Sequence, residues 1–428
     1  MRIRSMIGGN TRSINNPVRT AGIVIAASAV LGCSDGLGPN PEGRFIVNNN
    51  QAELSLRVHA IEAGVPLPIS VDRLPNFTSA PPDADVQLTL RAQVDPPVVD
   101  GITLQATHVD FSHPKVYVSY NVQGPVRMGG IDVFFNPKPK ELELWSQGIF
   151  LDTDVSAVDW AEGDVLYLAT GTSSEGFETP AVLEEIELDF HRLTENVRRV
   201  DVPSFAGTGV KVVGDRVYVT SGTGGDPVGG LSVFDRASLG LLYFDAFADA
   251  RGVDAWDGTI VAMHGTPAGI RVYSDLPELQ ASHEVGGATV PESKSTVRVA
   301  NDLAFVAAGE EGLKVVSLID GSVVQHIPVP TVDGVAPEMA VTNGVSVSGD
   351  LVFAANGGAG LFVYRASVDL EETATVDPQL ILLGQVQFPD GGSANFVWCA
   401  GDLIYVADGA GGLRVVQLQN ARKSVVSP

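Results

Sequence analysis

Residues 403–418, LIYVADGAGGLRVVQL, contain two alternating apolar runs joined by a short loop that includes Gly409 and Gly412. Such a loop could cradle a phosphate, hold calcium or form the tight turn of a β-hairpin. Related stretches occur at 303–318, LAFVAAGEEGLKVVSL, and at 351–364, LVFAANGGAGLFVY. A phosphate loop would occur once and open a helix, whereas this loop recurs and is followed by a strand. We therefore interpret it as a hairpin turn whose glycines adopt positive φ cheaply.

The hairpin belongs to a unit that recurs seven times between residues 105 and 418. Each unit has an alternating strand, a polar turn, a second alternating strand and a third strand after a glycine-rich turn. A fourth strand is visible in most units, for example at 141–145, 241–245 and 380–384. One residue of the second strand marks each unit: Tyr117, Tyr167, Tyr218, Val261, Phe305, Phe353 and Tyr405. Four strands per 43–52 residues predict an all-β, seven-bladed β-propeller.

The seventh unit has no convincing fourth strand, because few residues follow its third strand. An open ring would leave an unpaired strand edge. The segment VQLTLRAQV, about residues 86–94, lies just before the first unit. We predict that this strand completes the last blade and closes the ring. Residues 45–61 are then expected to form a strand pair, or a strand and a loop, beside it.

The three glycine-turn stretches resemble those of the LVIVD-repeat family of bacterial and archaeal surface propellers. The resemblance covers roughly residues 105–418. The second unit departs most, with a long loop at 171–185 and a weak third strand. The resemblance implies a propeller at the cell envelope. It implies no catalytic residues, since members of the family share no catalytic motif.

The N-terminus has the features of an export signal. Residues 1–34 contain four arginines and no acidic residue, and the apolar stretch AGIVIAASAVLG ends at Gly32. Twelve such residues are too few to span a bilayer but suit the core of a signal peptide. Cys33 follows directly and resembles the lipidated cysteine of a bacterial lipobox, although an ordinary cleaved signal peptide is the alternative. Ser34 after the cysteine favours the outer membrane of a bacterial cell envelope.

These features give the expected domain organisation. It comprises a lipoprotein signal peptide (1–32), a flexible tether (33–44), an N-terminal β segment with the closing strand (45–104), the propeller (105–421) and a C-terminal tail (422–428). The net charge of −24 argues against nucleic-acid binding and against direct binding to anionic lipid. The membrane would therefore be reached through the lipid on Cys33 alone. The second cysteine, Cys399, is interpreted as a buried apolar group, and no disulfide is expected.

The sequence offers little catalytic signal. It contains no Gly-x-Ser-x-Gly, His-Glu-x-x-His or Cys-x-x-Cys motif. The stretch GTGGDPVGG at 222–230 lacks the lysine and the helix of a phosphate loop, and is interpreted as a wide turn. Residues 152–163 begin like a calcium loop, but Ala157 and Gly163 replace the required glycine and glutamate. Calcium or another divalent cation elsewhere on the acidic surface stays possible as a cofactor.

One constellation emerges from aligning the units. Seven residues before each marker residue, or eight in the second unit, lie Asp110, Asp159, Lys211, Asp254, Arg298, Ser346 and Trp398. This tier is predicted to surround the central channel, either as an ion-pair network or as a pocket for a small ligand or cation. His108 and Asp110 share one face of a strand and are weak metal-ligand candidates. No nucleophile is paired with a base, so no catalytic residue is predicted.

The expected function is therefore binding without catalysis. An envelope-anchored propeller would bind or scaffold a protein, a glycan or another surface component through its loops. One alternative is an extracytoplasmic enzyme of the hydrolase or lyase type, with a cation or small ligand at the channel. Another is a stabilising spacer within an outer-membrane complex. The fold alone does not choose among these functions.

Overall fold

The computed structural model describes residues 43–74, 86–136, 138, 141–222, 228–265, 267–275, 277–286, 294–373, 377–388 and 392–420. The expected signal peptide, Cys33, most of the expected tether, residues 223–227 and the expected tail lie outside these residues. The chain divides into two units, Met1–Asp35 and Gly36–Pro428, and the description below concerns the second. No helix in the described ranges is long and apolar enough to cross a membrane.

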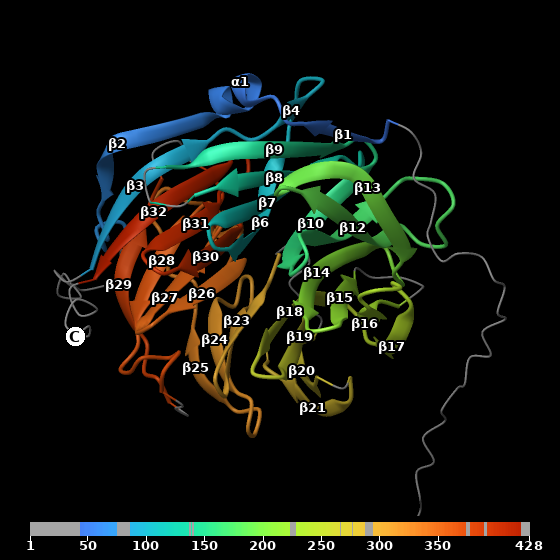
Figure 1. Ribbon diagram of the computed structural model, residues 1–428. Helices are drawn as coiled ribbons and strands as arrows, with labels where there is room; N and C mark the ends of the chain where they lie inside the picture. Colours follow the sequence, from blue (N-terminus) through green and yellow to red (C-terminus); the bar gives the residue numbers. More distant parts are fainter. Residues whose placement is uncertain are drawn as a thin grey trace, which may run out of the picture. The chain divides into compact units, whose positions relative to one another are not determined.

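The described strands form seven sheets of four or five strands and one small sheet of β4 (Val98–Val99) and β5 (Ile102–Thr103). The seven larger sheets follow one another around a central axis (Figure 1). Each sheet is a blade, and its strands are given from the axis outward. Blade 1 contains β6 (Gln105–Ser112), β7 (Lys115–Asn121), β8 (Gly129–Phe135), β9 (Glu143–Phe150) and β1 (Phe45–Asn48). Blade 2 contains β10 (Thr153–Ala161), β11 (Val165–Thr172), β12 (Ala181–Asp189) and β13 (Arg192–Asp201). Blade 3 contains β14 (Ala206–Val213), β15 (Arg216–Gly222), β16 (Gly230–Asp235) and β17 (Leu241–Ala246).

The remaining blades have the same arrangement. Blade 4 contains β18 (Ala250–Trp256), β19 (Thr259–Gly265), β20 (Ala268–Ser274) and β21 (Leu279–Glu284). Blade 5 contains β22 (Val297–Ala300), β23 (Leu303–Ala307), β24 (Leu313–Ser317) and β25 (Val323–Ile327). Blade 6 contains β26 (Gly344–Ser348), β27 (Leu351–Ala355), β28 (Leu361–Arg365) and β29 (Ile381–Val386). Blade 7 contains β30 (Phe396–Ala400), β31 (Leu403–Ala407), β32 (Leu413–Asn420), β3 (Val86–Val94) and β2 (Val58–Leu67).

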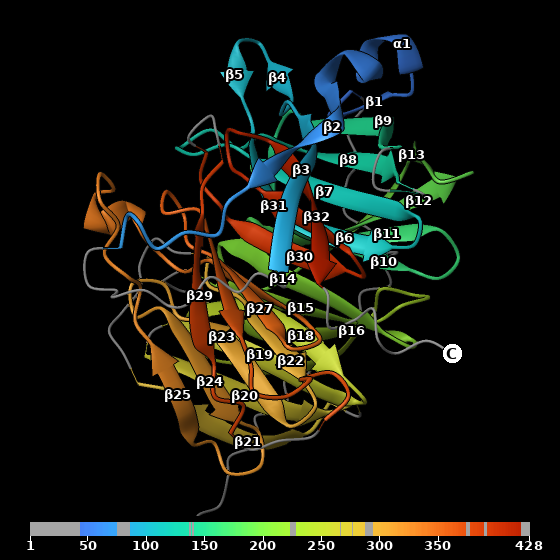
Figure 2. The same ribbon diagram turned by 90° about the vertical axis from the view of Figure 1, so that its left-hand side faces the viewer.

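The predicted seven-bladed propeller and its closing strand are confirmed. Strand β3 pairs antiparallel with β32, with Leu88 opposite Leu418 and Val94 opposite Leu413. In Figure 2 the blue β3 lies beside the red β32, although the two strands come from opposite ends of the described chain. The last blade therefore consists of three C-terminal strands and two N-terminal ones.

The segment before the closing strand differs in part from the expectation. Strand β2 pairs with β3 as expected, but β1 pairs with β9 in blade 1 instead of joining blade 7. The short helices α1 (Gln51–Leu54) and η1 (Ser55–Arg57) connect β1 to β2. The Arg57 side chain then binds the Asp132 carboxylate of blade 1, with an Nη2–Oδ2 distance of 2.6 Å. The N-terminal segment is thus attached to both blades that meet where the ring closes.

The third strand of blade 2 is longer than the sequence pattern predicts. The interpretation of residues 171–185 as a loop is wrong at its end, because β12 begins at Ala181 and pairs with β11 from Ala181 to Glu187. Two acidic residues interrupt the apolar pattern of this strand, so the sequence did not indicate where it begins. Glu184 and Glu185 are buried, and each forms an ion pair with an arginine of the neighbouring β13. Charge that is paired inside the fold looks like solvent-exposed charge in a sequence.

The hydrophobic core lies between neighbouring blades. The seven marker residues of the second strands are all buried, with at most 1% of their surface exposed. One core cluster, for example, joins Tyr405 and Val415 of blade 7 to Val109 and Val116 of blade 1. Cys399 packs at the edge of another cluster and is partly, not fully, buried.

The glycine-rich turns connect blades as well as strands. Gly409 has a φ of +56° and its carbonyl accepts the Ala106 N–H of blade 1 at 2.9 Å. Equivalent bridges join Gly309 to Thr342 and Gly357 to Ala394 in the next blades. The recurring glycine loop is therefore a hairpin, as predicted, and it also fastens its blade to the following one.

Candidate functional site

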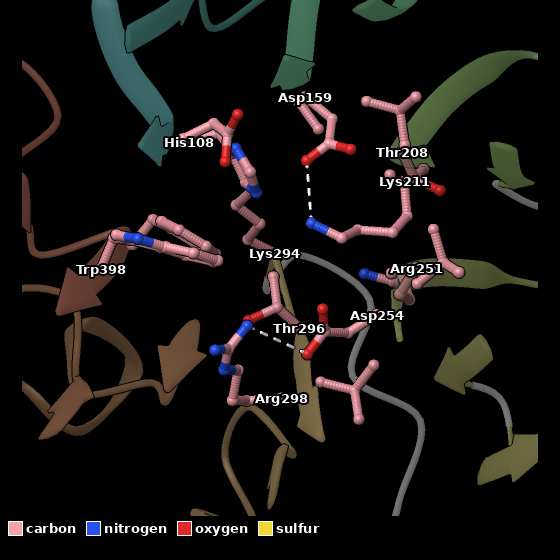
Figure 3. Close-up of a pocket in the computed structure, with 18 of the residues that line it drawn as sticks. His108, Asp159, Thr208, Lys211, Arg251, Asp254, Lys294, Thr296, Arg298 and Trp398 are labelled. Carbon is pink, nitrogen blue, oxygen red and sulfur yellow. Dashed lines mark hydrogen bonds and ion pairs between the residues drawn. The ribbon is translucent and has the colours of Figure 1, made fainter. Parts of the chain in front are cut away.

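A pocket lies on the central axis and is lined by residues along the innermost strands, from Lys294 just before β22 to tier residues such as Asp110 near the end of β6. It contains about 520 Å³ of atom-free space, a figure that includes space open to solvent. The tier residues that line it are Asp110, Asp159, Lys211, Asp254, Arg298 and Trp398. Figure 3 shows Trp398 on one side, Lys211 and Arg251 on the opposite side, Asp159 above, and Asp254 and Arg298 below. Ser346 lies on the innermost strand β26, but it is buried and is not a lining residue. We call this space the channel pocket.

The acceptor side chains of the tier bind the backbone of the following blade. The carboxylates of Asp110, Asp159 and Asp254 and the Ser346 hydroxyl each accept one backbone N–H. The donors are Trp160, Val212, Val299 and Cys399, at distances of 2.8, 2.6, 2.8 and 3.0 Å respectively. Each donor directly follows a tier residue in the next innermost strand. These four polar residues therefore connect blades 1 to 2, 2 to 3, 4 to 5 and 6 to 7.

Two cations of the tier pair with carboxylates of the preceding blade. Lys211 Nζ lies 2.9 Å from Asp159 Oδ1, and Arg298 Nη1 lies 3.4 Å from Asp254 Oδ2. The Arg298 guanidinium also stacks over Trp398, 4.6 Å from the ring centroid. The ion-pair arrangement considered from the sequence is thus present in the pocket.

Burial dominates the protonation behaviour of these groups. It raises the pKa of Asp110 and of Asp159, because a carboxylate loses hydration inside the ring. Burial alone would lower the pKa of Lys211, but the charges of Asp159, Asp110 and Asp254 outweigh it and raise that pKa. The lysine therefore stays charged, while the carboxylates around it take up protons more readily than exposed ones.

Lys294, which the alignment of units did not single out, crosses the pocket from the residues just before β22. Its Nζ donates hydrogen bonds to the Thr107 carbonyl of blade 1 and, at 2.7 Å, to the Ser156 carbonyl of blade 2. Both acceptors sit where the inner strand pairing shifts by one residue, between Ala106 and His108 and between Val155 and Ala157. A β-bulge leaves its extra residue out of the ladder, so these carbonyls are free to point to the axis.

His108 lies beside Lys294 and faces cations. Its ring stacks on Phe396, with 4.0 Å between the centroids. Burial, followed by the charges of Lys294 and Lys211, lowers the pKa of His108 well below its usual value. The described part of the chain contains no group of three or more His, Cys, Asp or Glu side chains arranged to hold a metal ion. The surroundings of His108 therefore favour a neutral imidazole.

The hydroxyl groups of the pocket also connect blades. Thr208 donates to the Ala250 carbonyl at 2.9 Å, and Thr296 donates to the Asn343 carbonyl at 3.2 Å. Arg251 binds the Asp249 carboxylate at 2.9 Å. Since both hydroxyls donate to backbone oxygens and neither to a base, the arrangement supports binding more than nucleophilic catalysis.

Comparison with known proteins supports the fold. The sequence matches no protein-family model and no curated protein sequence. A chain from the crystal structure of the mitotic checkpoint complex is similar in fold, with a TM-score of 0.54, 11% identity, and coverage of 81% of this chain and 99% of that chain. The WD40 β-propeller domain of Doa1 is similar with a TM-score of 0.50, 12% identity, and coverage of 77% and 98%. At these identities the likeness concerns the fold alone.

Proposed function

We propose that this chain is an envelope-anchored lipoprotein whose propeller binds another protein through the face of the ring that lies on the side of Arg251, Lys294 and Phe396 of the channel pocket. We call this the pocket face. It is formed by the loops that lead into the innermost strands and by the loops between second and third strands, which lie together because neighbouring strands are antiparallel. A ring of blades holds such loops rigidly, which suits them to recognition.

The distribution of exposed apolar side chains carries this proposal. Six large apolar residues in pocket-face loops expose 40–62% of their surface: Val98, Val126, Leu151, Phe205, Val228 and Met339. On the loops of the opposite face, the described residues include two such side chains, Phe190 and Ile319. Eight further exposed apolar residues of the described chain lie on outer strands or on the helix between β1 and β2. Of the two faces, the pocket face carries more exposed apolar side chains, which favours it as the protein-binding surface.

The anchoring part of the proposal comes from the N-terminal sequence and the LVIVD-repeat resemblance. Lipidation of Cys33 would attach the propeller to the outer membrane through residues 34–42. Growth of the source cells with an alkyne fatty acid tests this directly. The wild-type chain should carry the label and fractionate with envelopes, and Cys33→Ala should do neither. Unlabelled wild-type protein would contradict the anchor.

A matched pair of variants tests the binding face. The mature protein would be cross-linked in its own envelopes and purified, alongside Val126→Asp/Met339→Asp and the opposite-face control Phe190→Asp/Ile319→Asp. We expect one cross-linked protein partner with the wild type and the control, and its loss with the pocket-face variant. Equal capture by all three proteins would refute the choice of face. Recovery of polysaccharide in place of a protein would refute the partner class.

A further inference from the structure

We propose that the channel pocket binds a small oxyanion, through a carboxylate or phosphate group, and that Lys294 is the residue that receives it. This inference is independent of protein binding at the pocket face. It adds a ligand site on the axis of the ring, built from the described innermost strands and the residues just before β22.

The pocket lining contains more basic than acidic side chains, whereas the chain as a whole contains more acidic ones. The whole chain has 51 acidic and 27 basic residues. The pocket lining, however, contains four cations, Lys211, Arg251, Lys294 and Arg298, against three carboxylates. Three of the cations pair with a carboxylate: Asp159, Asp249 or Asp254. Two lining groups then have no ion-pair partner among the described residues, the cation Lys294 and the carboxyl group of Asp110. Burial raises the pKa of Asp110 and so favours its neutral form, which leaves Lys294 as the cation that an anion can pair with.

The hydrogen bonds of the Lys294 amine leave one of its donors for a ligand. An ammonium group has three hydrogen-bond donors, and the carbonyls of Thr107 and Ser156 use two of them. These two bonds hold the amine in place and leave the third donor free. Burying an ammonium group away from water costs free energy when no carboxylate lies beside it. A bound anion would supply the negative charge that offsets this cost.

Other unused groups in the pocket are also donors. Arg298 Nε and His108 Nδ1 are buried and have no hydrogen-bond partner among the described residues. The guanidinium Nε can only donate, and an imidazole nitrogen donates in one of its two tautomers. The carboxylates have partners already, since Asp110, Asp159 and Asp254 each accept a backbone N–H, and Asp159 and Asp254 also pair with a cation. An acceptor-rich oxyanion therefore fits this pocket better than a metal cation does.

The protonation of Lys294 should make anion binding depend on pH. Burial lowers the pKa of Lys294 well below its usual value. An anion favours the charged amine, so binding should be accompanied by proton uptake once the pH exceeds the lowered pKa, and affinity should fall as the pH rises. The charged and titratable groups around the amine are His108, Asp110, Asp159, Lys211, Arg251, Asp254 and Arg298.

Titration calorimetry of the mature chain with inorganic phosphate, sulfate, acetate and succinate, each against a chloride background, tests the proposal. Wild-type protein and the exposed-lysine control Lys138→Gln should bind at least one oxyanion saturably, and more tightly at about pH 6 than at about pH 9. Lys294→Gln should weaken binding at least tenfold. Binding of acetate or succinate alone would assign the carboxylate class, and binding of phosphate or sulfate alone the phosphate class.

A second variant keeps the test decisive if Lys294→Gln does not fold. His108→Phe removes the unpartnered nitrogen and keeps a ring against Phe396, so it should fold and still weaken binding. Absence of binding by the wild type, or equal affinities of wild type and a folded pocket variant, would overturn the proposal. Cross-linking to the envelope partner should be unchanged in Lys294→Gln, which separates this test from that of the pocket face.

Discussion

Replacement of Gly412 by alanine should weaken the pairing of β3 with β32, which closes the ring. Gly412 has a φ of +75°, and a Cβ there would overlap the Val94 carbonyl oxygen of β3 and lie 3.0 Å from the Pro96 nitrogen. The left-handed backbone conformation alone costs an alanine about 1–2 kcal/mol. Forcing a methyl group against a fixed carbonyl adds about 1–3 kcal/mol, because β3 must move away from β32. Gly412→Ala should therefore cost about 2–5 kcal/mol.

Gly401→Ala is the matched control. Gly401 has a φ of +62°, but nothing lies within 4 Å of the position of its added Cβ. This variant should lose only the conformational part, about 1–2 kcal/mol. Urea unfolding followed by tryptophan fluorescence measures both free energies of unfolding. If the two variants differ by less than about 0.5 kcal/mol, the closing contact between the Gly412 turn and β3 does not limit stability, and the reasoning is wrong.

Three further substitutions test the charges inside the ring. Arg44→Met should cost about 2–4 kcal/mol in urea unfolding, because Arg44 is buried and bound to two carboxylates, with its Nη2 2.7 Å from Glu184. Lys211→Met should cost a similar amount, and Lys211→Met/Asp159→Asn should cost at least about 1 kcal/mol less than the sum of the single variants. Burial raises the pKa of Asp154 to about 6, so its folded form keeps a proton that the unfolded chain has lost, and wild-type stability falls as the pH rises through this window. Asp154→Asn should remove that fall, so its melting temperature should gain on the wild type between about pH 4 and about pH 8.

The fold was predictable because a propeller repeats both its pattern and its contacts. Each second strand packs a marker residue such as Tyr405 between two blades, so the apolar period is the same in every unit. The closing strand was predictable because an unpaired edge on β32 requires a partner, and residues 86–94 alternate correctly. Strand β1 was placed beside the closing strand and not in blade 1, since four residues cannot show which of two adjacent blades they join. The start of β12 was missed because Glu184 finds its cations only after folding.

The position of the tier and its ion pairs were predictable, but its hydrogen bonds to the backbone of the next blade were not. The spacing of the tier residues follows from the spacing of the innermost strands. The choice of residue at each position depends on contacts with the neighbouring blade, which the sequence does not show. Asp254 is required to accept the Val299 N–H of the next blade, a bond between residues 45 positions apart in the chain. Ser346 makes the same bond to Cys399 with a hydroxyl, which explains why the tier mixes acids with a neutral residue. The alignment could show that the seven positions are equivalent, but not that Asp110, Asp159, Asp254 and Ser346 accept a backbone N–H of the next blade.

The residues that break the repeat are the better indicators of a ligand site. Seven equivalent blades would give a symmetric channel. The acceptor side chains of the tier fit such symmetry, because each one joins its blade to the next. Lys294 has no cationic counterpart at the corresponding position of any other unit, where Ala106, Ala250 or Thr342 stands instead. It reaches carbonyls that become available because the inner strands of blades 1 and 2 are bulged at Thr107 and Ser156. Bulges are common beside functional sites because they redirect groups out of the ladder. Lys294 comes from the segment before β22 of blade 5 and binds carbonyls of blades 1 and 2, which Asp110 already joins to each other. Its positive charge has no ion-pair partner among the described residues. Binding of an anion would supply this partner.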